Sequence, residues 1–214
     1  MLVAEQPVVT SRFAHVDATA ARIVAAVLET PPTLGSGRLV CVDGPAGSGK
    51  TTLAAALRRG FRDALRAAGA PADPTPVRML HMDNVYAGWA GLDVGMDTVA
   101  TCVVAPLRAG EPGSYRRYDW HRQCFAEERV VAPCDVLVIE GVGSGSSTYD
   151  DAITCLVWVD TPSDVRLSRG LARDGEALRA EWEGWAAREQ VMFARERTRA
   201  RADLVVDGTG GSTT

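Results

Sequence analysis

Short apolar runs alternate with longer amphipathic stretches along most of the chain. The runs at 40–42, 77–83, 135–141, 153–160 and 202–208 are rich in β-branched residues and predict strands. The stretches at 51–69 and 95–110 have helical composition, and a charged helical stretch extends from about 162 to 201. This order predicts an α/β fold, a parallel β-sheet of about five strands flanked by helices, because nearly continuous apolar runs suit strands buried on both faces.

The two ends of the chain differ from this middle. A helix is predicted from about Asp17 to Glu29, where Pro31 and Pro32 end it. We expect residues 1–37 to form an N-terminal helical extension, residues 38–208 to form the main domain, and residues 209–214, rich in glycine and serine, to be a disordered tail.

Composition excludes several classes of protein. The 214 residues carry a net charge of −4, which gives no basic field for a nucleic-acid polymer. The N-terminus lacks the features of a signal peptide, and no apolar stretch reaches the roughly 18 residues of a membrane span. Five scattered cysteines without a Cys-x-x-Cys pair argue against a disulfide framework or a zinc site. We expect a cytoplasmic protein without a membrane partner.

A single lysine marks the strongest motif. Of the 23 basic residues, 22 are arginine, and the only lysine is Lys50. It lies in "GPAGSGKT", residues 44–51, a full match to the G-x-x-x-x-G-K-[ST] phosphate loop, with a predicted strand before it and a helix after it. A lysine in such an arginine-rich chain indicates a site where a guanidinium group cannot replace the ammonium group.

The chemistry of such a loop predicts ATP and Mg²⁺ as cofactors. Glycines allow backbone N–H groups to surround phosphate oxygens at the positive end of a helix. Lys50 is expected to reach the β- and γ-phosphates, and the Thr51 hydroxyl to ligate Mg²⁺. The predicted nucleotide-binding residues are Gly44, Ala46, Gly47, Ser48, Gly49, Lys50, Thr51 and Thr52.

Four acidic residues follow the predicted strands. Asp43, Asp83, Glu140 and Asp160 each come at the end of an apolar run. Ligands of parallel sheets lie beyond the carboxyl ends of the strands, so these acids are expected at the same edge as the phosphate loop. For Asp83 a turn or helix-cap role is the alternative. Glu140 supports Mg²⁺ or else pairs with an arginine, because a buried carboxylate needs a cation.

With these residues placed, the chain resembles the uridine kinase-like branch of the P-loop kinases over most of residues 38–208. "HMDNVY" resembles the family's segment with a catalytic aspartate, and "YDW" at 118–120 resembles its Y-D-F, which helps to enclose the nucleoside base. "VLVIEG" resembles the strand whose glutamate supports Mg²⁺, and "DVRLSRGLARD" resembles the arginine-bearing lid helix. The lid segment, about 162–180, is shorter than the family's, and His121 follows Trp120 directly.

The resemblance implies roles for further residues. It implies Asp83 as the catalytic base, with Lys50, Arg169 and Arg173 stabilising the transferred charge. It implies that the acceptor contacts Asp83, Tyr86, Asp93, Tyr118 and Trp120, and that Thr51 and Glu140 hold the metal. For the segment 114–125 the residues alone also allow an amphipathic hairpin whose aromatic side chains cover the core. Arg166, Arg169 and Arg173 recur at helical spacing, which a solvated helix face also explains.

Three further residues lie on one stripe of the predicted helical stretch. Trp182 and Trp185 belong to an apolar stripe that favours core packing. Glu189 falls on the same stripe and either pairs with an arginine or reaches the acceptor pocket.

The sequence thus predicts an ATP-dependent kinase that phosphorylates a hydroxyl of a small molecule, and a nucleoside is the first choice of acceptor. Pantothenate, a sugar phosphate or a nucleoside monophosphate are alternative acceptors. A nucleotide-binding regulatory module without transfer activity is the alternative from another class. The oligomeric state is left open, and a homo-oligomer is one of the states considered.

Overall fold

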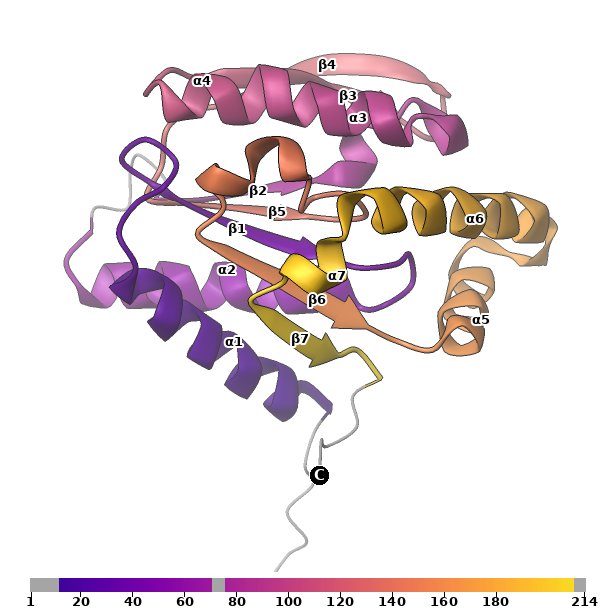
Figure 1. Cartoon of the computed structure of the whole chain (residues 1–214), viewed down its shortest axis with the longest axis horizontal. Coiled ribbons are helices and arrows are strands. Elements are labelled where there is room, and N and C mark those ends of the chain that lie inside the picture. The colour runs from indigo at the N-terminus through magenta and orange to yellow at the C-terminus, as the bar shows by residue number, and fades with distance from the viewer. Residues whose placement is uncertain (1–11, 71–75, 210–214) are drawn as a thin grey trace, which may run out of the picture.

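The structure, a computed structural model, describes residues 12–70 and 76–209 (Figure 1). Five parallel strands form one sheet in the order β2-β5-β1-β6-β7. These strands are β1 (Arg38–Asp43), β2 (Val77–His81), β5 (Val136–Glu140), β6 (Cys155–Asp160) and β7 (Leu204–Asp207). The predicted α/β fold with about five parallel strands is confirmed. Because β1 is central, the loop that follows it emerges at the middle of the sheet's carboxyl edge.

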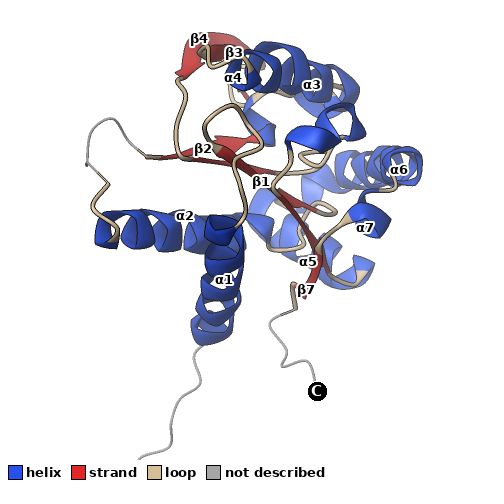
Figure 2. Cartoon of the chain, turned by 60° about the vertical axis from the view of Figure 1, so that its left-hand side comes forward, coloured by secondary structure: helices blue, strands red, loops and turns tan. Residues whose placement is uncertain are grey.

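Helices cover both faces of the sheet (Figure 2). On one face lie α1 (Arg12–Glu29) and α2 (Lys50–Ala67), which pack against each other. The other face is covered by a helical segment made of α3 (Leu92–Thr98), a π-helix (Val99–Val104) and α4 (Ala105–Arg108), and by α6 (Arg179–Glu196). The short helices α5 (Ser163–Asp174) and α7 (Thr198–Arg201) flank α6 in the chain.

Alternation along the central strands divides the core in two. In β1, Leu39 and Cys41 pack with residues of α3 and α6, whereas Val40 and Val42 pack with α1 and α2. All four side chains are fully buried, because successive residues of a strand point to opposite faces and both faces are covered.

Several predicted boundaries differ from the observed ones. The first helix begins at Arg12 rather than near Asp17. The strand predicted over 77–83 ends at His81, and Met82–Asn84 form a 3₁₀ turn, so Asp83 follows the strand instead of ending it. The stretch from 162 to 201 is interrupted at Gly175 and at Arg197, where φ is 99° and 53°, because a left-handed backbone cannot continue a helix.

A hairpin stands apart from the main sheet. It consists of β3 (Gly113–Asp119) and β4 (Cys124–Val131), which pair antiparallel. Tyr115 and Tyr118 are buried on its inner side. Because β3 ends at Asp119, Tyr118 lies on the strand and Trp120 belongs to the turn that follows it.

Two other predictions concern membrane-spanning helices and the C-terminal tail. Within the described ranges, every helix is too short or too polar to cross a bilayer. The predicted disordered tail lies, from residue 210 onward, outside the described residues.

Candidate active site

A pocket of about 920 Å³ opens at the carboxyl edge of the sheet. The phosphate loop, residues 44–52, forms one wall, and aromatic side chains form another. Most of the predicted site residues line this pocket: Ala46, Gly47, Gly49, Lys50, Thr51, Thr52, Asp83, Tyr86, Tyr118, Trp120, Glu140, Arg169 and Arg173. The structure therefore brings together residues from the phosphate loop, the start of α2, the segment after β2, the hairpin, β5 and α5.

The phosphate loop has the backbone shape that its glycines predict. Gly44, Gly47 and Gly49 have φ values of 139°, 78° and 101°, which side chains with a Cβ rarely adopt. A Cβ on Gly47 would also lie 2.6 Å from the carbonyl oxygen of Arg166, so the loop is in close contact with α5. Helix α2 begins at Lys50, and the first N–H groups of a helix have no partner within the helix. They are therefore available to an anion in the loop.

Lys50 lies inside the loop. Its side chain is buried, and Nζ donates to the carbonyl oxygens of Gly44 (2.7 Å) and Pro45 (2.8 Å). Burial lowers the pKa of the ammonium, and the negative charges of Glu140 and Asp43 oppose this shift. The only lysine of the chain thus places its charge at the centre of the predicted phosphate site.

Thr51 and Glu140, the two predicted metal ligands, are in contact. The Thr51 hydroxyl donates to Glu140 Oε1 at 3.2 Å, and the same oxygen lies 2.6 Å from Nδ1 of His81. The cationic partner that sequence reasoning offered for Glu140 was an arginine, but the residue in contact is His81. The hydrogen bond to Glu140 raises the pKa of His81.

These residues fit a magnesium ion that is shared with phosphates. In the part of the chain that the structure describes, no group of three or more His, Cys, Asp or Glu side chains could hold a metal alone. Mg²⁺ at nucleotide sites is commonly held by one or two protein groups together with phosphate oxygens and water. One hydroxyl and one buried carboxylate, side by side at the loop, match that donor set.

Asp83 faces the pocket from the turn after β2. Its side chain is exposed to the pocket, and its carbonyl oxygen accepts a hydrogen bond from Trp120 Nε1 at 2.8 Å. The walls of the pocket shield the carboxyl group from water, and this desolvation raises its pKa. The negative charge of Glu140 raises the pKa further. A carboxylate with a raised pKa is a better proton acceptor.

The other two strand-end acids have different partners. Asp43 is fully buried and accepts from the amides of Gly44 (2.7 Å), Gly143 (2.9 Å) and Gly145 (2.8 Å), so it joins the phosphate loop to the loop after β5. Burial raises the pKa of Asp43 to about 6, against the effect of these amides and of Lys50. Asp160 pairs with Arg199 at 3.2 Å and is not among the residues that line the pocket.

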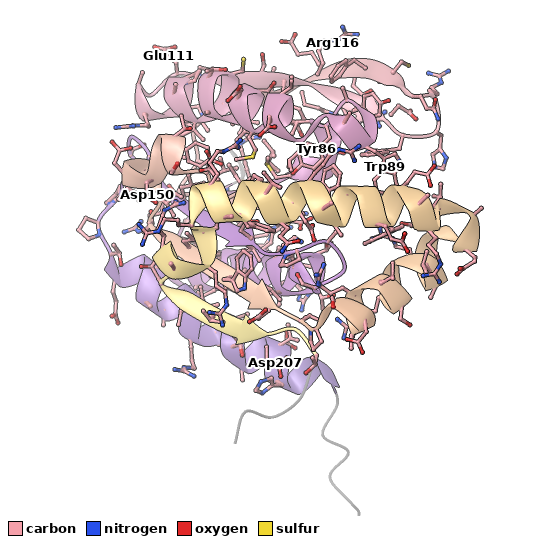
Figure 3. All side chains as sticks on the ribbon, turned by 45° about the vertical axis from the view of Figure 1, so that its right-hand side comes forward. Tyr86, Trp89, Glu111, Arg116, Asp150 and Asp207 are labelled. Carbon is pink, nitrogen blue, oxygen red and sulfur yellow. The ribbon has the colours of Figure 1, made fainter. Side chains whose placement is uncertain are left out.

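Five aromatic residues form what we call the aromatic wall: Trp89, Tyr118, Trp120, Trp182 and Trp185. Trp89 is central, with its ring centroid 5.5, 6.3 and 6.0 Å from those of Trp120, Trp182 and Trp185. Tyr118 meets Trp120 edge to face at 5.5 Å. Figure 3 shows Trp89 and Tyr86 in the space between α3 and α6.

Tyr86 also lines the pocket and packs against this wall. It is fully buried, its ring centroid is 5.2 Å from that of Trp185, and its hydroxyl donates to the carbonyl oxygen of Val142. Burial raises its pKa well above the ordinary value for tyrosine.

The three arginines of α5 have separate partners. Arg169 donates to the carbonyl oxygens of Gly47 (3.4 Å) and Gly208 (3.0 Å). Arg173 pairs with Asp174 at 2.7 Å and lies over the ring of Trp182. Arg166 pairs with Glu189 at 2.9 Å. Arg169 and Arg173 line the pocket, and Arg166 is not among its lining residues.

Some residues do not lie where the sequence predicts. Asp93 lies on α3 with an exposed carboxylate that pairs with Arg195 at 2.8 Å, and it is not among the residues lining the pocket. Gly44 and Ser48 belong to the loop without lining the pocket. Trp182 and Trp185 were expected to pack in the core, and they are both buried and part of the pocket wall.

His121 and Gln123 also line the pocket, from the turn of the hairpin. The sequence held no signal for Gln123, because its position depends on a positive φ of 52° that is unusual for glutamine.

Comparisons with known proteins concern the sequence family and the fold. The profile of the phosphoribulokinase / uridine kinase family matches residues 95–198. The structure is similar to that of a possible uridine kinase from Bacillus stearothermophilus, with a TM-score of 0.62, 20% identity, and 92% of this chain and 100% of the other covered. A candidate fructose transport system kinase from Silicibacter sp. TM1040 has a TM-score of 0.57, 22% identity, and coverage of 87% and 98%.

A comparison with curated proteins finds no match. The fold carries the phosphate loop at its central strand, and the family profile covers the hairpin, β5, β6, α5 and α6. The resemblance drawn from the sequence is therefore confirmed: the chain has the fold of the P-loop kinases, and residues 95–198 match the profile of the phosphoribulokinase / uridine kinase family.

Proposed function

We propose that this protein transfers the γ-phosphate of ATP to a hydroxyl group of a nucleoside. The observation that carries the proposal is one pocket with two unlike walls, in which Asp83 lies beside the aromatic wall and faces the region of Lys50, Thr51 and Glu140. Phosphoryl transfer needs positioning, neutralisation of charge and a base near the attacking hydroxyl, and the pocket offers side chains for each.

The phosphate loop is the proposed ATP site. Its amides and Lys50 would hold the phosphates, and Thr51 and Glu140 would hold Mg²⁺. When bound, Mg²⁺ neutralises charge on the phosphate oxygens. His81 contacts the same Glu140 oxygen, Oε1, as the Thr51 hydroxyl does, and so helps to orient the carboxylate.

Asp83 is the proposed base. It would accept the proton of the attacking hydroxyl, and its raised pKa suits that task. Trp120 fixes the peptide of Asp83 through the hydrogen bond to its carbonyl oxygen. Arg169 and Arg173 are proposed to stabilise the transferred charge from the lid, which we place at about 162–180 within a kinase domain of residues 38–208, preceded by the extension 1–37.

The aromatic wall supports a planar, unphosphorylated acceptor. Tyr118 and Trp120 offer ring faces and edges of the kind that contact nucleobases. Four basic residues of the described chain line the pocket: Lys50 lies in the phosphate loop, Arg169 contacts Gly47 of that loop, Arg173 pairs with Asp174, and His121 is in the turn of the hairpin. A phosphorylated acceptor would favour more positive charge beside the aromatic wall, so a nucleoside is preferred to a nucleoside monophosphate or a sugar phosphate.

The experiment is ATP turnover with Mg²⁺ across a panel of nucleosides, pantothenate, sugar phosphates and nucleoside monophosphates. We expect one nucleoside to stimulate turnover, and Asp83→Asn to lower kcat by about 10²- to 10⁴-fold while the Kd for MgATP stays within about twofold. Asp160→Asn is the matched control, because Asp160 is also a strand-end acid but pairs with Arg199.

Two results would count against the proposal. Stimulation by a phosphorylated acceptor alone would replace the nucleoside but keep the chemistry. ATP binding without turnover on any acceptor, with Asp83→Asn indistinguishable from wild type, would favour a regulatory module.

A further inference from the structure

One buried acid has no role in the proposed transfer. Glu189 lies on α6 with only 2% of its surface exposed, next to the buried Trp185 and Met192. A carboxylate in such a place is costly unless it is paired and hydrogen-bonded. Glu189 has both kinds of partner: Oε2 accepts the N–H of Ala46 at 2.8 Å, and Oε1 accepts from Arg166 Nη1 at 2.9 Å.

Arg166 holds the same peptide from another helix. It lies on α5, its side chain is 16% exposed, and the nitrogen that pairs with Glu189 also donates to the carbonyl oxygen of Ala46 at 3.2 Å. Its Nε donates to the carbonyl oxygen of Thr161 at 3.1 Å. Both backbone polar groups of Ala46 are therefore held by the two members of one ion pair.

Ala46 belongs to the phosphate loop, so this ion pair acts on the loop's shape. The next residue, Gly47, has its α-carbon against the backbone of Arg166, where a Cβ would be 2.6 Å from the carbonyl oxygen. Arg169, one turn further along α5, donates to the carbonyl oxygen of Gly47. The first turns of the lid helix and the first half of the loop therefore form one unit, which Glu189 joins to α6.

We propose that Glu189 is a positioning residue, which acts through Arg166 and Ala46 to hold the phosphate loop in the shape that receives the phosphates of ATP. The inference rests on the proposed function only in that MgATP must bind to this loop. Phosphoryl transfer itself is not required for it.

The charges support a positioning role. Burial raises the pKa of Glu189, and the amide of Ala46 and the positive charges of Lys50 and Arg166 oppose that shift. A lone negative charge beside the loop would repel phosphates, but Arg166 compensates it. The pair thus supplies an acceptor for Ala46 without adding net charge to the site.

The test separates positioning from stability. Replacing a buried ion pair with apolar residues of similar volume is often neutral or stabilising, so Arg166→Met with Glu189→Met is expected to fold with a free energy of unfolding close to that of wild type. Both side-chain contacts to Ala46 are lost in this variant. We expect its Kd for MgATP, measured by calorimetry, to rise about tenfold or more, as for loss of hydrogen bonds to charged groups.

A second variant gives the same test if the double variant does not fold. Glu189→Asp keeps the charge but retracts the carboxylate from Ala46, and it should raise the Kd severalfold. Glu196→Asp is the matched control: Glu196 lies on the same helix, is 9% exposed, and accepts the N–H of Ser147 at 2.8 Å, away from the phosphate loop. It should lose stability without any change in the Kd for MgATP.

Three other results would overturn the positioning role, the kinase function or both. A folded double variant, or a folded Glu189→Asp, that binds MgATP within twofold of wild type would show that the pair only stabilises the fold. Wild-type protein that binds MgATP but transfers phosphate to nothing would overturn the proposed kinase function alone. Wild-type protein that does not bind MgATP would overturn both.

Discussion

The two walls of the pocket are built in different ways. The phosphate wall comes mainly from one continuous segment, Gly44 to Thr52, whose backbone shape is set by its own glycines and by the start of α2. The aromatic wall comes from three regions that are distant in the sequence: Trp89 after β2, Tyr118 and Trp120 at the hairpin, and Trp182 and Trp185 on α6. The first wall depends on local conformation and the second on tertiary packing.

The two walls also differ in the interactions that they offer to a ligand. Charged groups and amides dominate the phosphate wall, so changes there should act on ATP binding and on charge in the transition state. Ring contacts dominate the aromatic wall, so changes there should act on the acceptor and on packing. Variants in one wall that affect only its own ligand would support the comparison, and variants that affect both ligands would break it.

The largest effect is expected at Lys50. Lys50→Met removes the only positive charge that lies inside the phosphate loop, where Nζ is held by Gly44 and Pro45. We expect kcat for ATP turnover to fall by about 10²- to 10³-fold, the usual cost of removing one preorganised electrostatic contact. The KM for the acceptor should stay within about twofold.

The control for Lys50→Met is Arg59→Met, which removes a cation from the same helix where it pairs with Asp17 on the surface. Turnover by Lys50→Met within tenfold of wild type would remove Lys50 from the proposed mechanism.

The next effect concerns the centre of the aromatic wall. Trp89→Ala removes ring contacts to Trp120, Trp182 and Trp185, and each such contact is worth about 0.5–1.5 kcal/mol beyond buried area. We expect the KM for the acceptor to rise about tenfold, the Kd for MgATP to stay unchanged, and Trp89→Phe to restore most of the loss.

Trp158→Ala is the control for the loss of a tryptophan ring, because Trp158 packs on Phe193 at 4.7 Å and is not among the pocket-lining residues. If Trp89→Ala weakened MgATP as much as the acceptor, the two walls would not be separate.

A third prediction concerns the junction of the walls. A Cβ on Gly170 of α5 would overlap the indole of Trp182 on α6. Gly170→Ala should therefore lower the free energy of unfolding by about 1–3 kcal/mol, as overpacking does, and should reduce turnover by displacing Arg169 and Arg173. Gly184→Ala, on α6 where only the end of the Arg188 side chain is near, should instead stabilise by up to about 1 kcal/mol. Urea unfolding of both variants measures the contrast, and equal effects would contradict it.

The smallest effect is expected at the hairpin that carries Tyr118 and Trp120. Glu127 lies between Arg117 and Arg129, and the hydrogen bond from Arg117 lowers the pKa of Glu127 from 4.5 to about 2. Because the pKa is lower in the folded state, the stabilisation is complete above pH 4.5 and is lost as the pH falls toward 2. Glu127 is exposed, so solvent screening keeps the effect small.

An NMR titration of the hairpin checks this, with Glu127→Gln as the variant that should abolish the transition. A Glu127 midpoint near 4.5 would show that the ion pairs do not form in solution.

The comparison of the walls also explains which residues could be predicted. The phosphate loop could be predicted from the sequence because glycines, one lysine and a threonine at fixed spacing define a local backbone shape. Asp83 and Glu140 were placed at the pocket because the carboxyl ends of parallel strands meet at one edge. Asp93 was expected beside them, but α3 directs it toward Arg195, a residue about a hundred positions away that no local pattern connects to it.

The sequence by itself determined the α/β class, the parallel strands, the phosphate loop and the edge at which the acids gather, because these follow from periodicity and local backbone preference. Only the tertiary structure decided that Trp182 and Trp185 line a pocket as well as a core, that His81 is the partner of Glu140, and that Glu189 and Arg166 hold Ala46. Each of these depends on how α5 and α6 and the loops dock on the sheet, and docking is set by packing between residues far apart in the chain.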